Sequence, residues 1–201
     1  MKIIECEQLS ETWFQLRAGR PTASHFDKIV TAKGAPSKQA EKYLYQLAGE
    51  RLLGDKVETY TNAAMQRGTE LEPEARQLFE LIHGDVRQVG LCMTDDEKVS
   101  CSPDGLMDGV GLEIKCPLIH THIGYLLGGK LPTEYTQQVQ GSMWVTGYSS
   151  WFFMSYYPGL KPLIVEAERD DEFCAALKVE LDEFCKKLDA MENKLREIGN
   201  A

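Results

Sequence analysis

Hydrophobic and polar positions recur with two different periods along this chain, and the change of period separates expected helices from expected strands. Apolar residues three or four positions apart indicate amphipathic helices, and alternation indicates half-buried strands. Helical spacing predicts helices over residues 9–17, 23–30, 37–53, 62–83 and 133–146, with Ser10 as the cap of the first. Alternating or aromatic-rich apolar runs predict strands over residues 86–93, 97–103, 150–157 and 162–166. This order predicts an α/β fold in one domain, residues 1–201, with a mixed central β-sheet flanked by helices.

The last thirty residues form the clearest periodic element. Apolar residues recur every three or four positions with charged residues between them: Phe173, Leu177, Leu181, Phe184, Leu188, Met191, Leu195 and Ile198. The stripe predicts one amphipathic helix over about residues 169–198, packed across the sheet. A short coiled coil or a contact between subunits is the alternative.

Composition narrows the class of protein. With 201 residues, 43% of them hydrophobic, the chain can bury one sizeable core. It has no run of about 18 apolar residues and no basic-plus-apolar leader, so we expect neither a membrane span nor a secretory signal. The six cysteines include no Cys-x-x-Cys pair, which favours reduced thiols in a cytoplasm over a metal cluster. The net charge of −9 argues mildly against a protein that coats DNA nonspecifically, but excludes no DNA enzyme.

A polar face on an otherwise apolar strand marks the first candidate site. Residues 101–116 predict a β-hairpin in which one strand ends at Asp104 and the turn lies at Asp108-Gly109. Alternation along the second strand places Glu113 and Lys115 on one face, and strand pairing brings Asp104 close to it. Burying these groups is costly unless they are paired or bind a metal.

A third carboxylate comes from the predicted helix over residues 62–83. Glu72 lies three and seven residues before apolar positions of that helix, so it points near the buried face. Together with Asp104 and Glu113 it would form an oxygen-rich cluster that suits magnesium or manganese. Lys115 would then orient a water or stabilise charge on a phosphate. A buried salt-bridge network fits the same spacing, and spacing alone does not decide between them.

A second candidate site lies near the N-terminus. Arg17 ends the first predicted helix, and Thr22 and Ser24 open the next one just past Pro21. Free N–H groups at a helix start, hydroxyls and a guanidinium fork together suit a phosphate. Taken alone, ordinary capping by Thr22 with a solvated Arg17 is the favoured alternative.

The motifs, taken in order, resemble those of a nuclease family. Ser102–Gly105 followed by Gly111–Pro117 resembles the Asp…Glu-x-Lys core of the restriction-endonuclease-like PD-(D/E)XK nucleases. More closely, the chain resembles lambda exonuclease and the YqaJ-type phage recombination exonucleases. The other matching pieces are Trp13–Arg17, Pro21–Ser24, Gly68–Glu72, Ala75-Arg76, Leu78–Glu80, Cys101–Leu106, Gln138–Gln140 and Ser142–Thr146. One Glu-x-Lys is a weak signal because many strands contain it, whereas the ordered set is specific.

The resemblance implies roles for the residues of the predicted hairpin and helix. Asp104, Glu113 and the backbone carbonyl of Ile114 match the family's metal ligands. Glu72 matches a carboxylate that contacts the metal from a helix, directly or through a water. Lys115 matches the catalytic lysine. The expected cofactor is Mg²⁺, as two ions, and Mn²⁺ would substitute for it.

The resemblance also implies contacts with DNA. Arg17, Ser24 and Ser102 match positions that hold the terminal 5′-phosphate of the degraded strand. Gln138 matches a glutamine beside the active site. Met65 falls where the family places an apolar residue that wedges the duplex end apart.

The implied function is a Mg²⁺-dependent 5′-to-3′ exonuclease on linear double-stranded DNA. It would digest one strand to mononucleotides and leave 3′ overhangs for phage-type homologous recombination by single-strand annealing. The family forms a ring-shaped homotrimer around DNA and passes the overhang to a phage single-strand annealing protein. We therefore expect these partners, in the cytoplasm of a bacterial host.

Two other functions are compatible with the sequence. The first is an endonuclease or a RecB-like nuclease on the same fold. The phosphate-site residues favour recognition of an end, and the lack of a cysteine cluster disfavours the iron–sulfur members. The second is a non-catalytic DNA-binding module, against which the intact Asp, Glu and Lys set argues.

Overall fold

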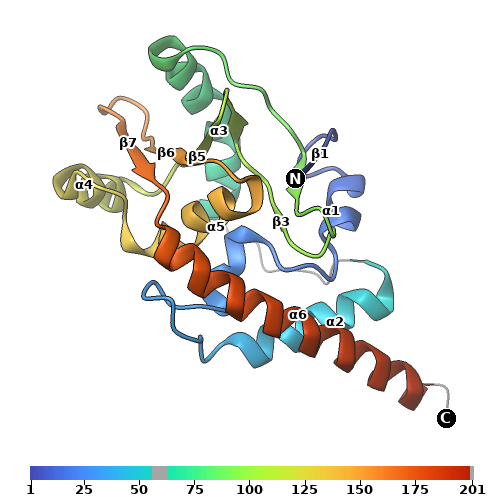
Figure 1. The fold of residues 1–201 in the computed structure, drawn as a ribbon. Coiled ribbons are helices and arrows are strands. Elements are labelled where there is room, and N and C mark those ends of the chain that lie inside the picture. The colour runs from blue at the N-terminus through green and yellow to red at the C-terminus, as the bar shows by residue number, and fades with distance from the viewer. Residues whose placement is uncertain (56–62, 200–201) are drawn as a thin grey trace.

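The computed structural model describes residues 1–55 and 63–199 and shows two β-sheets with helices packed around them (Figure 1). The strands are β1 (Lys2–Ile4), β2 (Leu91–Met93), β3 (Ser100–Cys101), β4 (Gly105–Leu106), β5 (Val110–Lys115), β6 (Ser150–Ser155) and β7 (Leu163–Glu168). The α-helices are α1 (Glu11–Arg17), α2 (Ala40–Leu53), α3 (Ala63–His83), α4 (Ile119–Gly128), α5 (Thr136–Thr146) and α6 (Asp171–Gly199). Two 3₁₀ helices, η1 (Ala23–Lys28) and η2 (Thr133–Tyr135), precede α2 and α5.

The strands divide between an antiparallel sheet and a mixed sheet. Three strands form the first in the order β1-β2-β3, and four form the second in the order β4-β5-β6-β7. Strands β5 and β6 run parallel, whereas β4 and β7 pair antiparallel to their neighbours. This confirms the predicted α/β fold with a mixed sheet flanked by helices. The segment between β3 and β4, residues 102–104, crosses from one sheet to the other.

Different helices cover the two sides of the mixed sheet. The largest buried cluster gathers side chains of η1, α2, α5 and α6, and α6 runs alongside α2 across that side (Figure 1). Helix α3 packs on the other side, where Phe79 and Ala75 meet Leu112 and Ile114 of β5. The apolar stripe of α6 is buried at Phe173, Leu177, Leu181, Phe184 and Leu188. This confirms a single amphipathic helix over most of the predicted range.

The two predicted helix caps have different outcomes. Ser10 caps α1 as expected, because its Oγ accepts a hydrogen bond from the N–H of Trp13 at 3.3 Å. The prediction for Thr22 is wrong: its side chain makes no capping bond, and the helix that follows it is the 3₁₀ helix η1. Thr22 instead forms a parallel bridge with Ser100, whose N–H donates to the carbonyl of Pro21 at 3.0 Å. The backbone therefore needs an extended conformation at this point.

Several predicted boundaries are also wrong. The strand expected over residues 86–93 shrinks to β2, because Arg87 bridges to Leu106 of β4 instead of joining the first sheet. The strand expected over residues 97–103 shrinks to β3. The helix expected over 37–53 begins at Ala40. The next helix is described from Ala63, and Asn62, where we expected it to begin, lies outside the described residues.

Two elements, β1 and α4, were not predicted at all. Helix α4 contains glycines and β-branched residues, which are poor helix formers, and no Asp, Glu, Lys or Arg that would mark an outer face. It is only 10 residues long. Within the ranges that the structure describes, no helix is long and apolar enough to span a bilayer.

Gly111 allows β5 and β6 to pack closely. It is the register partner of Trp151, and a Cβ at residue 111 would lie 2.2 Å from ring atom Cζ3 of this fully buried tryptophan. We predict that Gly111→Ala lowers the free energy of unfolding by about 1–3 kcal/mol, because the indole must move. Urea unfolding measures this change.

Gly124→Ala is the matched control for this prediction. Gly124 lies in α4, and among the described residues no heavy atom comes within 4 Å of the place that an alanine Cβ would take. Alanine there should therefore stabilise the protein by up to about 1 kcal/mol, because it favours the helix. Equal effects of the two substitutions would contradict the role assigned to Gly111.

Candidate active site

Strand β5 carries the predicted polar face. Glu113 is only 2% exposed, and its Oε1 forms an ion pair with the Nζ of Lys115. Gln138 of α5 donates from Nε2 to the same oxygen at 2.6 Å. The opposite face of β5 packs against α3 through Leu112 and Ile114, as alternation along the strand predicts.

Asp104 lies beside this face, although not within the strand that we expected to end there. The paired strand β4 begins one residue later, with Gly105 opposite Leu112. Asp104 is held by its own contacts: its N–H donates to the carbonyl of Leu112 at 3.0 Å, and its Oδ2 accepts from the N–H of Ile114 at 2.5 Å. The predicted hairpin exists, but its first strand follows Asp104.

Glu72 approaches from α3 and is tied to Asp104 by a residue whose role we did not predict. Arg76 forms an ion pair with Oε1 of Glu72, and its Nε donates to the carbonyl of Asp104 at 2.9 Å. With the amide oxygen of Gln88 turned toward it, Arg76 also donates to that oxygen at 2.6 and 3.1 Å. The i,i+4 spacing of Glu72 and Arg76 was the available sequence signal.

Burial and neighbouring charges shift the pKa values of ionisable groups in this site. Burial, followed by the charges of Glu113 and Glu72, raises the pKa of Asp104 well above its usual range. Burial also raises the pKa of Glu72, against the opposing effect of Arg76. Burial alone would lower the pKa of Lys115, but the carboxylates of Glu113 and Asp104 raise it above its usual range. The site therefore concentrates negative charge that a cation can offset.

The donor set fits a hard divalent cation. The second oxygen of Glu113, Oε2, is buried and has no hydrogen-bond partner among the described residues. Carboxylate oxygens are the ligands that Mg²⁺ and Mn²⁺ prefer. No group of three or more His, Cys, Asp and Glu side chains within residues 1–55 and 63–199 already converges as a metal site. Since Arg76 holds Glu72, an indirect contact of this carboxylate with a metal through a water is compatible with the structure.

The second candidate site is a guanidinium between two hydroxyls. Arg17 donates from Nη1 to the Oγ of Ser102 at 2.7 Å and from Nη2 to the Oγ of Ser24 at 3.2 Å. Its guanidinium carbon lies 4.2 Å from the centroid of the Trp13 ring. Within the part of the chain that the structure describes, no carboxylate forms an ion pair with Arg17.

Arg17 is buried, so the alternative of a solvated arginine is wrong. Its residue exposure is 9%, and burial lowers its pKa to about 10, which leaves it charged at neutral pH. A buried cation whose donors point to hydroxyls is well suited to bind an anion. The three residues that the resemblance assigned to a phosphate thus lie together.

Side chains from the N-terminal segment hold the 102–104 crossing in place. Trp13 donates from Nε1 to the Oγ of Ser102 at 3.2 Å and to the carbonyl of Gly90 at 3.1 Å. Gln8 donates from Nε2 to the carbonyls of Val89 and Pro103 at 2.9 and 2.8 Å. We predicted neither role, and these contacts span 77 to 95 residues of sequence, beyond any local pattern.

Met65 lies in the first turn of α3 and is 53% exposed. It precedes Glu72 by seven residues, which corresponds to about 10 Å along a helix axis. Its assignment as a wedge at the duplex end stays a prediction.

Comparisons with solved structures find the same fold in other proteins. The alkaline exonuclease LHK-Exo from Laribacter hongkongensis superposes with a TM-score of 0.86 and 35% sequence identity, covering 95% of this chain and 98% of that chain. The same enzyme in complex with dAMP gives a TM-score of 0.85 over the same coverage. A phage related exonuclease from Haemophilus somnus 129PT shares the fold, with a TM-score of 0.69 at 17% identity over 88% of this chain and 96% of that chain.

Sequence comparisons find a relative and a family model that match this chain. ExoD of Escherichia coli (strain K12) is 36% identical over 80 residues, which is 37% of this chain and 88% of ExoD. The family model of the YqaJ-like viral recombinase domain matches residues 12–149, a range that contains every residue of the two candidate sites. The chain therefore belongs to the family of YqaJ-like viral recombinase domains.

Proposed function

We propose that this protein is a Mg²⁺-dependent exonuclease that degrades one strand of linear double-stranded DNA from its 5′ end. It would release mononucleotides and leave 3′ overhangs for recombination by single-strand annealing. The observation that carries the proposal is the adjacency of the two sites. Ser102, which accepts a hydrogen bond from Arg17, lies two residues before Asp104 of the carboxylate cluster. A terminal phosphate bound by Arg17 would therefore lie next to the carboxylates.

The family supports this activity. The similar enzyme from Laribacter is an alkaline exonuclease, and its complex with dAMP holds a mononucleotide, the kind of product that we propose. The reaction class follows from chemistry as well, because a carboxylate cluster with a lysine suits hydrolysis of a phosphodiester.

Asp104, Glu113 and the backbone carbonyl of Ile114 would hold Mg²⁺, with Glu72 contacting it through a water. We expect two ions, with Mn²⁺ as a substitute. Bound there, Mg²⁺ would lower the pKa of a bound water and stabilise negative charge on the phosphate. Gln138 keeps the Glu113 carboxylate oriented by donating to Oε1, which leaves Oε2 available.

Lys115 would act on the attacking water and on the phosphate. Its side chain is 28% exposed, and its Nζ lies 5.4 Å from the centroid of the Tyr135 ring. An ammonium anchored by Glu113 has donors left for a water and for a phosphate oxygen. Charge stabilisation of this kind is a large contribution to catalysis in preorganised sites.

Arg17, Ser24 and Ser102 would set the direction of digestion. Each cleavage from a 5′ end creates a new 5′-phosphate, which the same three side chains can bind before the next cleavage. Met65 would help to separate the strands. From the family resemblance, we extend the proposal to a homotrimeric ring around DNA and to transfer of the overhang to a phage single-strand annealing protein in the bacterial cytoplasm.

The experiment that tests the function compares linear and circular substrates. With Mg²⁺, the purified protein should release mononucleotides from linear duplex with 5′-phosphate ends and spare a covalently closed circle of the same sequence. EDTA should abolish the release, because the carboxylates would lose their cation. Acid-soluble nucleotide is the readout. Cutting of the circle would support an endonuclease, and binding without any hydrolysis would support a non-catalytic module.

We predict that Lys115→Ala lowers the hydrolysis rate by about 100- to 1,000-fold, as removal of one charge-stabilising donor does. Binding of duplex ends in EDTA should change by less than about threefold. The phosphate pocket, formed by Arg17, Ser24 and Ser102, remains intact in this variant. Lys130→Ala, at an exposed lysine, is the control and should keep the full rate. Hydrolysis that survives in Lys115→Ala would remove this residue from the mechanism.

We predict that Arg17→Ala erases the preference for 5′-phosphate over 5′-hydroxyl ends. Loss of charge-assisted hydrogen bonds should slow phosphorylated ends by about 10- to 100-fold and leave hydroxyl ends nearly unchanged. Initial rates on the two ends give the ratio. Arg87→Ala serves as the control, because Arg87 is exposed and ion-paired with Glu5. An unchanged ratio in Arg17→Ala would refute the pocket.

A further inference from the structure

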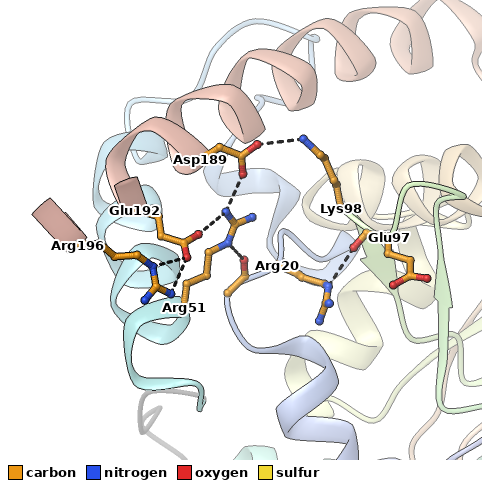
Figure 2. Close-up of polar contacts among 8 residues, drawn as sticks. Arg20, Arg51, Glu97, Lys98, Asp189, Glu192 and Arg196 are labelled. Carbon is orange, nitrogen blue, oxygen red and sulfur yellow. Dashed lines mark hydrogen bonds and ion pairs between the residues drawn. The ribbon is translucent and has the colours of Figure 1, made fainter. Parts of the chain in front are cut away.

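A polar network outside both candidate sites joins α2, α6 and the turn that follows α1 (Figure 2). At its centre is Arg51, two residues before the end of α2. Its Nη1 forms ion pairs with Asp189 at 2.7 Å and Glu192 at 3.1 Å, both on α6. Its Nε donates to the backbone carbonyl of Gly19 at 2.9 Å. One guanidinium therefore connects the C-terminal helix to the turn at Gly19.

The residue before Arg51 binds the other side of the same turn. Glu50 is 3% exposed, and its Oε2 accepts a hydrogen bond from the N–H of Gly19 at 2.9 Å. Its Oε1 accepts from Nε2 of Gln46 at 2.9 Å. Burial of a carboxylate is costly, so a glutamate here needs specific partners. Consecutive residues of α2 thus bind both the N–H and the C=O of one glycine.

We call the contacts of Glu50 and Arg51 with Gly19 the clamp. The backbone conformation at Gly19 allows these contacts. Its φ of +67° lies in the left-handed region that glycine adopts readily. A Cβ at residue 19 would lie 2.3 Å from Cγ of Arg51, so the aliphatic part of the arginine occupies the space that a side chain would need. The close approach requires glycine for both reasons.

The clamped turn lies between two residues of the phosphate pocket. Residues 18–22 connect Arg17, at the end of α1, to Ser24 in η1. The N–H of Arg20 also donates to the carbonyl of Arg17 at 3.2 Å, which closes the turn directly onto the pocket arginine. A shift of Gly19 would therefore change the distance between Arg17 and Ser24, which now share a hydrogen bond of 3.2 Å.

Helix α6 braces this clamp from outside. The Arg51 and Glu192 side chains are only 19% and 22% exposed, so their pairing is less screened than that of an exposed pair. Lys98 binds the second oxygen of Asp189 at 3.0 Å, and Arg196 donates to Glu192 at 2.8 and 3.0 Å. Among the described residues, neither the Lys98 nor the Arg196 side chain forms a hydrogen bond or ion pair with the turn, and Figure 2 draws their bonds to Asp189 and Glu192 only.

We infer that Glu50 and Arg51 are positioning residues for end recognition. They fix the turn at Gly19 and so hold Arg17 and Ser24 at the separation that binds a terminal phosphate, with α6 as the brace. The inference rests on the proposed role of the Arg17 pocket, and it adds two residues that touch neither DNA nor metal.

The test measures initial rates on matched duplexes that carry 5′-phosphate or 5′-hydroxyl ends. Arg51→Met keeps the aliphatic stem beside Gly19 and removes every donor. It should lower the phosphate-to-hydroxyl rate ratio by about tenfold, the loss of one charge-assisted contact, with the hydroxyl rate changed by less than about twofold. Glu50→Ala should act in the same way. Glu50→Gln keeps an acceptor for the N–H of Gly19 and should retain most of the preference.

Lys98→Ala and Arg196→Ala are the matched controls. Each removes a charge from the same network without removing a contact to Gly19, so the ratio should stay within about twofold of the unchanged protein. Fluorescence anisotropy in EDTA provides a readout without catalysis. Arg51→Met should lose affinity for the phosphorylated end and keep its affinity for the hydroxyl end.

Three results would overturn the inference. One is a normal ratio in folded Arg51→Met and Glu50→Ala proteins, judged by their melting temperatures. Another is an equal fall on both kinds of end, which would indicate general stability alone. The third is an unchanged ratio in the double variant Asp189→Ala/Glu192→Ala, which keeps Arg51, removes both acceptors on α6 and serves as the test if Arg51→Met does not fold. If the protein without substitutions shows no preference for 5′-phosphate over 5′-hydroxyl ends, the phosphate pocket itself is refuted.

Discussion

The carboxylate of Glu113 is buried in the middle of the mixed sheet, and the candidate active site is arranged around it. A charged group in the interior is destabilising unless neighbours compensate it. Lys115 and Gln138 compensate one oxygen of Glu113, and the other remains buried without a partner among the described residues. Because β5 lies between β4 and β6, the sheet cannot move this charge toward solvent. Positive charge therefore has to come from neighbouring side chains or from a bound ion. A divalent cation fits that requirement.

The two candidate sites lie side by side because one short segment contributes a residue to each. The crossing between the two sheets places Ser102 at the Arg17 pocket and Asp104 at strand β5, where it binds the N–H of Ile114, within three residues. Pairing of residues 21–22 with Ser100 brings the N-terminal pocket to this crossing from 85 residues away in sequence. A terminal phosphate bound by Arg17 can then lie next to the phosphodiester that would react at the carboxylates.

The 102–104 crossing and the turn at Gly19 lack strand pairing and are held in the same way. Backbone groups outside helices and sheets need partners when they are buried, and long polar side chains supply them here. Arg76 and Gln8 bind the carbonyls of the 102–104 crossing, and Glu50 and Arg51 bind the peptide groups of Gly19. Each of these side chains thereby joins its own segment to the one whose backbone it binds. The candidate site is thus held by residues that do not belong to it.

Features that depend on near neighbours along the chain can be predicted from the amino-acid sequence. Periodicity predicts the stripe of α6 and the alternation along β5, and residue type predicts the cap at Ser10. Each of these features arises within one or two turns of helix or a few residues of strand. Other features became visible only in the folded chain: the burial of Arg17, the extended backbone at Thr22, the placement of Asp104 before its strand, and the roles of Arg76 and Arg51. Those features depend on which distant segments pair, and pairing of distant segments is set by the packing of the whole core rather than by any local period.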